Sequence, residues 1–356
     1  MEGVLFFSFF QWFTIQREIV VNLSDAKYAS YALVQEMLET PAIMRKFDWN
    51  QTANIAQVVK ESGRLFMTGE GSSRIFPAKN AMYTAMKAGL PVALATDGSW
   101  QSAEYDLTNW AVFGASNSGQ TKEVVSLFRS LAENGHQKRF AMTANVGTKL
   151  QEVANETIVL SCGKENAVAA TKSVVEQGMI YLSILRNLDA GICADDQLAA
   201  DVAEQILGME YDDEIIQKVA QSPIIYFAGR NNGAAEELRL KTNEITRKKS
   251  DYLEGTYLLH GIEEVMNAGE TIVILEPFES ECRKIQELLV EKIGVNVVAV
   301  ASRPTIFPTV VIPSVKDFDP LLQLVAGWNL LVQVGIALGI NLDKPNRARK
   351  IGNEIE

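Results

Sequence analysis

The chain has 356 residues and a mass of 39.3 kDa, which suits two domains of about 150 residues better than one. Its 44 acidic and 33 basic residues give a formal net charge of −11, so its surface should repel nucleic acid and anionic membranes. Any phosphate group must therefore be held locally, by amide and hydroxyl groups. With only three cysteines and two histidines, we expect no disulfide framework, no zinc site and a reducing cytoplasm.

The first fifteen residues are strongly apolar, but they are fewer than the roughly 20 that span a bilayer. No basic residue precedes Arg17 and no small-residue cleavage site follows, so a secretory signal is not expected. We expect residues 1–22 to be an apolar N-terminal extension or a packing segment. A segment that associates with a membrane is the alternative.

The first half of the chain begins with helical spacing at 25–37 and 54–62, and then short apolar runs alternate with helical patterns. The predicted strands are 65–68, 92–95, 110–115, 139–143 and 157–160. The helices between them are 74–88, 121–133 and 148–154. Strands that alternate with helices of this length predict an α/β fold with a parallel, doubly wound sheet.

A long helical pattern at 167–188 and a polar, acidic stretch near 195–201 lead into the second half. The second half has predicted strands at 224–228, 271–275, 295–300 and 309–312, with helices at 234–248, 281–292 and 321–338. The glycine-containing turn at 69–73 has a counterpart at 229–233, 160 residues later. This weak repeat predicts a duplicated unit, with one domain at 23–195, a second at 205–356 and a linker near 190–210.

Ser116-Asn117-Ser118-Gly119-Gln120-Thr121 directly follows an apolar strand and directly precedes a helix. Ligands of α/β sheets bind at such strand-to-helix turns, and a helix N-terminus favours a phosphate. The density of hydroxyl and amide side chains predicts phosphate binding. The alternative is that Ser118 simply caps the helix.

A second turn, at 69–73, carries Ser72 and Ser73 and also lies between a strand and a helix. A turn with glycines and a serine is common, so this segment is weak evidence by itself. Two hydroxyl-rich turns on neighbouring strands could nevertheless hold the same phosphate.

Three further polar features have ordinary explanations when each is taken alone. The segment 163–172 reads as a first helical turn with Lys172 on a solvated face. Glu237, Lys241 and Glu244 have the spacing of a surface ion-pair ladder. His260 follows a stretch with no predicted strand, and a lone histidine is more often structural than catalytic.

Taken together, these segments resemble the sugar isomerase (SIS) family, and most closely the isomerase half of glucosamine-6-phosphate synthase and its stand-alone relatives. The family motifs Cys-Gly-Thr-Ser, Ser-Gln-Ser-Gly-Glu-Thr and Glu-x-x-Val-Ala-Ser-Thr-Lys correspond to 70–73, 116–121 and 165–172. The Leu-Lys-Glu helix, the His-Gly pair and the Pro-Arg-Asn-Leu-Ala-Lys tail correspond to 241–244, 260–261 and 345–350. The resemblance covers roughly residues 35–356 and implies two tandem SIS domains, each with a flavodoxin-like sheet.

The resemblance also implies a role for individual residues. Glu244 would move a proton between C1 and C2 of the open-chain sugar, and Lys350 would lie near the anomeric oxygen. His260 would assist ring opening in the site of a partner subunit, which implies a homodimer with a shared active site. Glu165 and Val168 would contact the sugar, and no metal or organic cofactor is implied. The phosphate would be held by Ser72, Ser73, Ser116, Asn117, Ser118 and Thr121.

Two departures from the family pattern reshape the reducing end of the expected site. Ala170 replaces a serine, and Leu259-His260-Gly261-Ile262 replaces Lys-His-Gly-Pro. No nucleophilic N-terminal cysteine is found, so glutamine-dependent synthesis is not expected. The leading prediction is a phosphosugar aldose–ketose isomerase or amino-sugar-phosphate deaminase. The alternatives are a deglycase acting on phosphorylated fructosyl-amino acids and a non-catalytic phosphosugar sensor.

Overall fold

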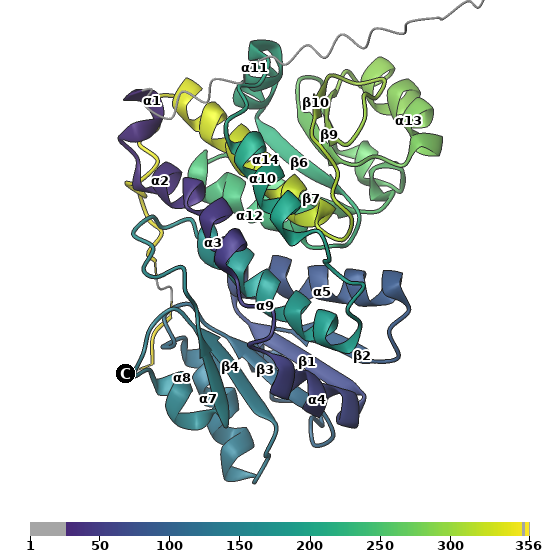
Figure 1. Cartoon of the computed structure of the whole chain (residues 1–356). Helices are drawn as coiled ribbons and strands as arrows, with labels where there is room; N and C mark the ends of the chain where they lie inside the picture. Colours follow the sequence, from purple (N-terminus) through teal and green to yellow (C-terminus); the bar gives the residue numbers. More distant parts are fainter. Residues whose placement is uncertain (1–25, 351–352, 356) are drawn as a thin grey trace, which may run out of the picture.

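Figure 1 shows the protein as a computed structural model, in which residues 26–350 and 353–355 are described. The predicted extension at 1–22 lies outside these residues. From residue 26 onwards, four helices come before the first sheet: α1 (Ala26–Ala29), α2 (Ala32–Leu38), α3 (Thr40–Lys46) and α4 (Ala53–Ser62). Helices α2 and α3 contact α10 (Asp196–Leu207), so the start of the described chain packs against a segment far along the sequence.

The first sheet has five parallel strands in the order β2-β1-β3-β4-β5. Its strands are β1 (Arg64–Gly69), β2 (Ala93–Asp97), β3 (Ala111–Ala115), β4 (Arg139–Thr143) and β5 (Glu156–Val159). The helices around it are α5 (Ile75–Ala88), α6 (Ser99–Ser102), α7 (Lys122–Glu133), α8 (Lys149–Val153) and α9 (Lys172–Leu188).

The second sheet also has five parallel strands, in the order β10-β9-β8-β6-β7. Its strands are β6 (Ile224–Gly229), β7 (Lys249–Glu254), β8 (Thr271–Leu275), β9 (Asn296–Ala301) and β10 (Thr309–Val311). The helices of this half are α11 (Asp213–Gln221), α12 (Ala234–Ile245), α13 (Glu279–Ile285), a π-helical turn (Gln286–Glu291) and α14 (Asp319–Ala337).

Numbered within its own half, each sheet has the strand order 2-1-3-4-5, which is the flavodoxin-like order. The predicted α/β class with parallel sheets flanked by helices is confirmed. Strand 2 lies on one side of strand 1, and strands 3 to 5 follow on the other side. The strand order therefore reverses between the first and third strands of each half, and α/β sheets bind ligands at that point. The switch points lie at the carboxyl ends of β1 and β3 and of β6 and β8.

The largest core cluster includes buried residues of both halves, among them Phe76, Tyr181, Leu238 and Trp328. Helix α14 is long and apolar enough to cross a membrane, but 89% of its most apolar window is buried inside the protein. Its apolar surface therefore serves the core. Cys162, Cys193 and Cys282 are all buried and unpaired.

Two parts of the second half differ from the prediction. The stretch before His260 contains strand β7, which pairs with β6 at the edge of the sheet. Its sequence, Lys-Ser-Asp-Tyr-Leu-Glu, is mostly polar because an edge strand is half exposed, and apolar patterning therefore missed it. Helix α10 begins in the stretch 195–201 that showed only a polar, acidic pattern, and its buried face includes Ala199, Ala203 and Ile206. The domain boundaries and the linker near 190–210 stay a prediction.

Candidate functional site

A cavity of about 580 Å³ lies where the first sheet meets helix α12 and the C-terminal tail. This volume is typical of small-molecule sites. Nine of the predicted site residues line it: Ser72, Ser73, Asn117, Ser118, Thr121, Glu165, Val168, Glu244 and Lys350. The fold therefore brings together residues that are up to 278 positions apart in the sequence.

The turn at 116–121 connects β3 to α7 and presents hydroxyl groups at the floor of the cavity. Ser116 is 1% exposed, and its Oγ lies 2.7 Å from Thr121 Oγ1 and accepts a hydrogen bond from the Gly119 amide at 3.1 Å. Ser116 is therefore buried and stabilises the turn, while Asn117, Ser118 and Thr121 line the cavity.

Helix α7 begins after Thr121, whose side chain makes no capping hydrogen bond. Ser118 Oγ accepts from the Gln120 amide at 3.1 Å, which is a local turn contact rather than a helix cap. The alternative that Ser118 caps the helix is therefore wrong. An uncapped helix N-terminus beside several hydroxyl groups can bind a phosphate.

Gly119 permits the tight shape of this turn. Its φ is +66°, and a Cβ at this position would lie 2.4 Å from the side chain of Thr148, the N-cap of α8. Both the backbone conformation and the close approach require glycine.

The second hydroxyl turn follows β1, beside the first, because β1 and β3 are neighbours in the sheet. It forms a short 3₁₀ turn at Gly71–Ser73, and Ser72 Oγ accepts a hydrogen bond from Lys241 Nζ at 2.9 Å. This contact joins the first half of the chain to helix α12 of the second half.

Helix α12 carries a buried group of charges instead of the surface ladder. The side chains of Lys241 and Glu237 are 0% exposed, and that of Glu244 is 21% exposed. Lys241 Nζ lies 2.7 Å from Glu244 Oε2 and 3.4 Å from Glu237 Oε1. Lys241 thus holds Glu244 at the cavity wall, and Glu244 keeps enough exposure to meet a ligand.

The charges on α12 depend on one another. Burial alone would lower the pKa of Lys241, but the carboxylates of Glu244 and Glu237 raise it above its ordinary value. Burial raises the pKa of Glu237, and Lys241 opposes that effect. Lys241 is therefore a firmly charged ammonium group behind the cavity.

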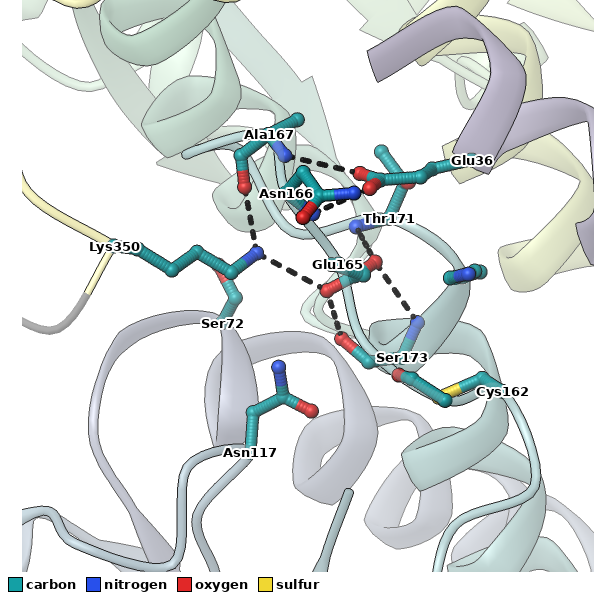
Figure 2. A network of polar contacts seen from close by, with 12 residues as sticks. Glu36, Ser72, Asn117, Cys162, Glu165, Asn166, Ala167, Thr171, Ser173 and Lys350 are labelled. Atoms are coloured by element: carbon teal, nitrogen blue, oxygen red, sulfur yellow. Dashed lines mark hydrogen bonds and ion pairs between the residues drawn. The ribbon is translucent and has the colours of Figure 1, made fainter. Parts of the chain in front are cut away.

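The segment between β5 and α9 holds the tail lysine. Glu165 Oε1 accepts hydrogen bonds from the Thr171 and Ser173 amides at 2.9 and 3.2 Å. Glu165 Oε2 accepts from Ser173 Oγ at 2.6 Å and lies 3.3 Å from Lys350 Nζ. Lys350 Nζ also donates to the Ala167 carbonyl at 2.7 Å, as Figure 2 shows.

These contacts shift the acidity of Glu165. Burial alone would raise its pKa, but Lys350 and the hydrogen bonds from Ser173 and Thr171 bring the pKa below its ordinary value. Glu165 is therefore an ionised anchor, and both of its oxygens are already engaged. Lys172, at the start of α9, is 4% exposed and pairs with Glu39, so it does not lie on a solvated face.

The C-terminal tail runs from the end of α14 across to the first sheet (Figure 1). Its last described residues pair with the beginning of α7: the Lys122 amide donates to the Asn353 carbonyl at 3.2 Å, and the Ile355 amide donates to the Gln120 carbonyl at 3.0 Å. The tail therefore contacts the hydroxyl turn directly and brings Lys350 to the cavity.

His260 lies away from this cavity within one chain. It lines a separate hollow with Tyr83, Arg230 and Tyr257, and its Nε2 lies 3.3 Å from Thr256 Oγ1. Its expected role in the site of a partner subunit stays a prediction.

Lys241 is the main site residue that the sequence-based prediction did not include. It lies between two acids at i−4 and i+3, and this spacing was the available signal. The same spacing occurs on exposed helices, so burial alone distinguishes the two cases. Lys164, Asn145 and Arg349 also line the cavity.

The fold and the cavity define an α/β protein of two similar halves with a hydroxyl-lined cavity. The SIS domain family model matches residues 59–186, so the chain carries a SIS domain and the predicted resemblance is confirmed. This match begins in α4, includes the whole first sheet and ends in the last turn of α9.

Known proteins extend the likeness beyond that domain. A glutamine–fructose-6-phosphate aminotransferase [isomerizing] of Staphylococcus aureus is 26% identical over 93% of this chain, and the chain spans 60% of the length of that relative. The structure of a tagatose-6-phosphate ketose/aldose isomerase from Escherichia coli gives a TM-score of 0.74 at 18% identity, covering 90% of this chain and 97% of that one. A glucosamine-6-phosphate deaminase from Thermotoga maritima gives 0.70 at 18% identity, covering 91% and 99%.

Proposed function

We propose that this protein is a phosphosugar aldose–ketose isomerase or amino-sugar-phosphate deaminase that moves a proton between C1 and C2 of an open-chain sugar phosphate. The observation that carries the proposal is the position of Glu244 in the cavity. It is a partly exposed carboxylate fixed by a buried lysine, in the same cavity as two hydroxyl turns. The names of the similar proteins, which include an isomerase and a deaminase, support the same reaction class.

In this proposal the phosphate binds at the two turns after β1 and β3. Ser72, Ser73, Asn117, Ser118 and Thr121 offer hydroxyl and amide groups, with the N-terminus of α7 behind them. Ser116 keeps the turn after β3 in shape. These groups attract an anion locally, although the net charge of the chain is −11.

Glu244 then acts as the base and the acid in turn. A carboxylate beside the carbonyl end of the sugar can take the proton from one carbon and return it to the next. Its contact with Lys241 fixes its position, which matters because proton transfer requires hydrogen-bond distance. The ammonium group of Lys350 stabilises negative charge that develops on the carbonyl oxygen during transfer.

The proposal extends to the assembly. The second half shares the strand order of the SIS domain, so we assign it as a second SIS domain that supplies α12 and the tail. A homodimer in the cytoplasm, with His260 completing the site of the partner subunit, explains why His260 lies away from the cavity of its own chain. Glu165 and Val168 shape the sugar end of the site.

A substrate panel tests this function. Purified protein is given glucosamine-6-phosphate, fructose-6-phosphate with ammonia, and a fructosyl-amino-acid phosphate, while hexose phosphates, ammonia and amino acid are measured. Interconversion of the first two supports the proposal. Release of amino acid alone would establish the deglycase, and a ligand-dependent rise in melting temperature without turnover would establish the sensor.

Glu244→Gln should abolish turnover and leave binding largely intact, because the amide keeps the shape of the side chain but cannot take a proton. The matched control is Glu214→Gln on α11, where an exposed glutamate also pairs with a lysine of its own helix. Turnover by Glu244→Gln at the rate of the control would contradict the role of Glu244.

A further inference from the structure

The segment at residues 163–170, which bears the Lys350 contacts, is held in an unusual way. It has no helix or strand, and among the described residues no backbone–backbone hydrogen bond involves any of its amides or carbonyls. Irregular backbone near a cavity needs partners of another kind, because unpaired buried amides cost free energy. For two of its amides, those of Asn166 and Ala167, the partner is a carboxylate.

The carboxylate that comes from outside the segment is Glu36 on helix α2. Glu36 is 4% exposed, and its two oxygens accept hydrogen bonds from the Asn166 amide and from the Ala167 amide, the latter at 3.2 Å. Figure 2 shows Glu36 on one side of the segment and Lys350 on the other. Hydrogen bonds between amides and a carboxylate are stronger than those between neutral groups.

Ala167 connects the two sides. Its amide donates to Glu36, and its carbonyl accepts from Lys350 Nζ at 2.7 Å. The adjacent Glu165 provides the ion pair with the same ammonium group at 3.3 Å. A shift of the Asn166–Ala167 backbone would therefore move both groups that hold Lys350.

We propose that Glu36 is a positioning residue: it fixes the 163–170 segment through the Asn166 and Ala167 amides, and through that segment it sets the location of the Lys350 ammonium group at the cavity. This inference rests on the proposed function, in which Lys350 acts on the substrate. It assigns to helix α2, outside the matched SIS domain, a direct part in building the site.

The tail provides a second tie to the same helix. Helix α2 lacks a side-chain cap of its own, and Asp343 accepts from the Ala32 and Leu33 amides at 2.8 and 3.0 Å. The beginning of α2 therefore holds the base of the tail, while its middle holds the segment that receives Lys350. Helix α2 therefore positions the tail at two points: directly at Asp343, and through the 163–170 segment at Lys350.

The test measures kcat and KM for Glu36→Gln, Lys350→Met and the double variant on the substrate found in the panel. Glutamine keeps the size of the side chain, but its NH2 group replaces one of the two oxygens and cannot accept from the backbone amide that this oxygen binds. We expect Glu36→Gln to lower kcat by up to about 100-fold, the effect of a displaced catalytic group, with a smaller change in KM. Because Glu36 acts through Lys350, the double variant should be no slower than Lys350→Met alone.

Two further variants distinguish the positioning of Lys350 from a general weakening of the packing around α2. Glu36→Asp keeps the charge and should recover part of the lost rate. Glu39→Gln removes the ion pair between the residue that follows α2 and Lys172 at the start of α9, without touching the contacts of Lys350. An equal loss of kcat in Glu39→Gln, or multiplied losses in the double variant, would overturn the proposal.

A measurement without substrate distinguishes this inference from the proposed function. Amide hydrogen exchange at Lys122 and Ile355, whose amides pair the tail with the beginning of α7, should become faster in Glu36→Gln than in wild type and in Glu39→Gln, whether or not the protein turns over any sugar. Unchanged exchange in the tail would reject the positioning role even if the enzyme is an isomerase. If exchange is faster in Glu36→Gln but the wild-type protein turns over no sugar, the proposed function is rejected and the link from Glu36 to the tail is kept.

Discussion

At the scale of single residues, the site depends on charged groups that are buried and paired. Glu165 has four contacts, with two backbone amides, one hydroxyl group and Lys350, so its ionised form is well satisfied away from water. Lys241 has the same character on the opposite wall, between Glu237 and Glu244. Such groups stay charged only while their partners are in place.

The lowered pKa of Glu165 predicts a dependence of stability on pH. Because its pKa in the folded state lies below the ordinary 4.5, its contribution is present above that pH and is lost as the pH falls through the folded-state pKa. We expect Glu165→Gln to lower the free energy of unfolding by about 1–3 kcal/mol at pH 7, since it leaves buried donors unsatisfied.

Urea unfolding of wild type and Glu165→Gln at pH 7 and at a pH below 4.5 checks this expectation. The difference in free energy of unfolding between the two proteins should be smaller at the lower pH, because the unfolded wild type then takes up a proton on Glu165. A gap of the same size at both pH values would show that the charge of Glu165 does not contribute.

At the scale of elements, the site is built from turns whose shape is set by neighbouring elements. The turn at 116–121 packs against the beginning of α8 at Gly119, and its Gln120 carbonyl pairs with the tail, as does the Lys122 amide at the start of α7. The turn at 70–73 is tied to α12 through Ser72 and Lys241. Each hydroxyl turn thus depends on an element from elsewhere in the chain.

Gly119→Ala tests the packing of the first turn. The new methyl group would meet the side chain of Thr148 at 2.4 Å, in addition to the strain of a φ of +66°. We expect a loss of about 1–3 kcal/mol of stability and a raised KM for the sugar phosphate.

The matched control is Gly135→Ala, because Gly135 has a similar φ of +75° but nothing within 4 Å of a Cβ. It carries the backbone strain without the clash and lies outside the cavity. Equal losses in stability and no change in KM for both variants would mean that the contact with Thr148 is unimportant.

Much at this scale could be predicted from sequence, for reasons that particular elements make clear. Apolar runs between glycine turns identified β1 and β3, and parallel strands place their following turns at one edge, so both hydroxyl turns were predicted together. Strand β7 was missed because a half-exposed edge strand has mostly polar residues. Helix α10 was missed because its acidic residues obscure the helical spacing of its buried apolar residues. The burial of Lys241 and the link from Glu36 to Lys350 join distant segments, and local patterns carry no information about such contacts.

At the scale of the whole molecule, one chain supplies most of the proposed site but not His260. The cavity combines the first sheet, helix α12 of the second half and the tail, whereas His260 lines another hollow. If His260 completes the site of a partner subunit, the functional unit is a dimer with two shared sites.

Mixing two inactive variants tests this arrangement. Glu244→Gln and His260→Ala proteins, each inactive alone, should regain activity when their subunits are exchanged, because one site in each mixed dimer then contains both native residues. A mixture of Glu244→Gln with the Glu244→Gln/His260→Ala double variant should stay inactive. No recovery in the first mixture, despite subunit exchange seen by mass spectrometry, would place His260 outside the catalytic site.

The most direct measurement of the central claim is proton exchange at the sugar carbon, followed by NMR in D₂O with fructose-6-phosphate. Wild-type protein should replace a C1 hydrogen with deuterium, and Glu244→Gln, which should still bind the sugar phosphate, should not. Binding of fructose-6-phosphate by wild-type protein without any exchange at C1, or undiminished exchange in Glu244→Gln, would contradict the account.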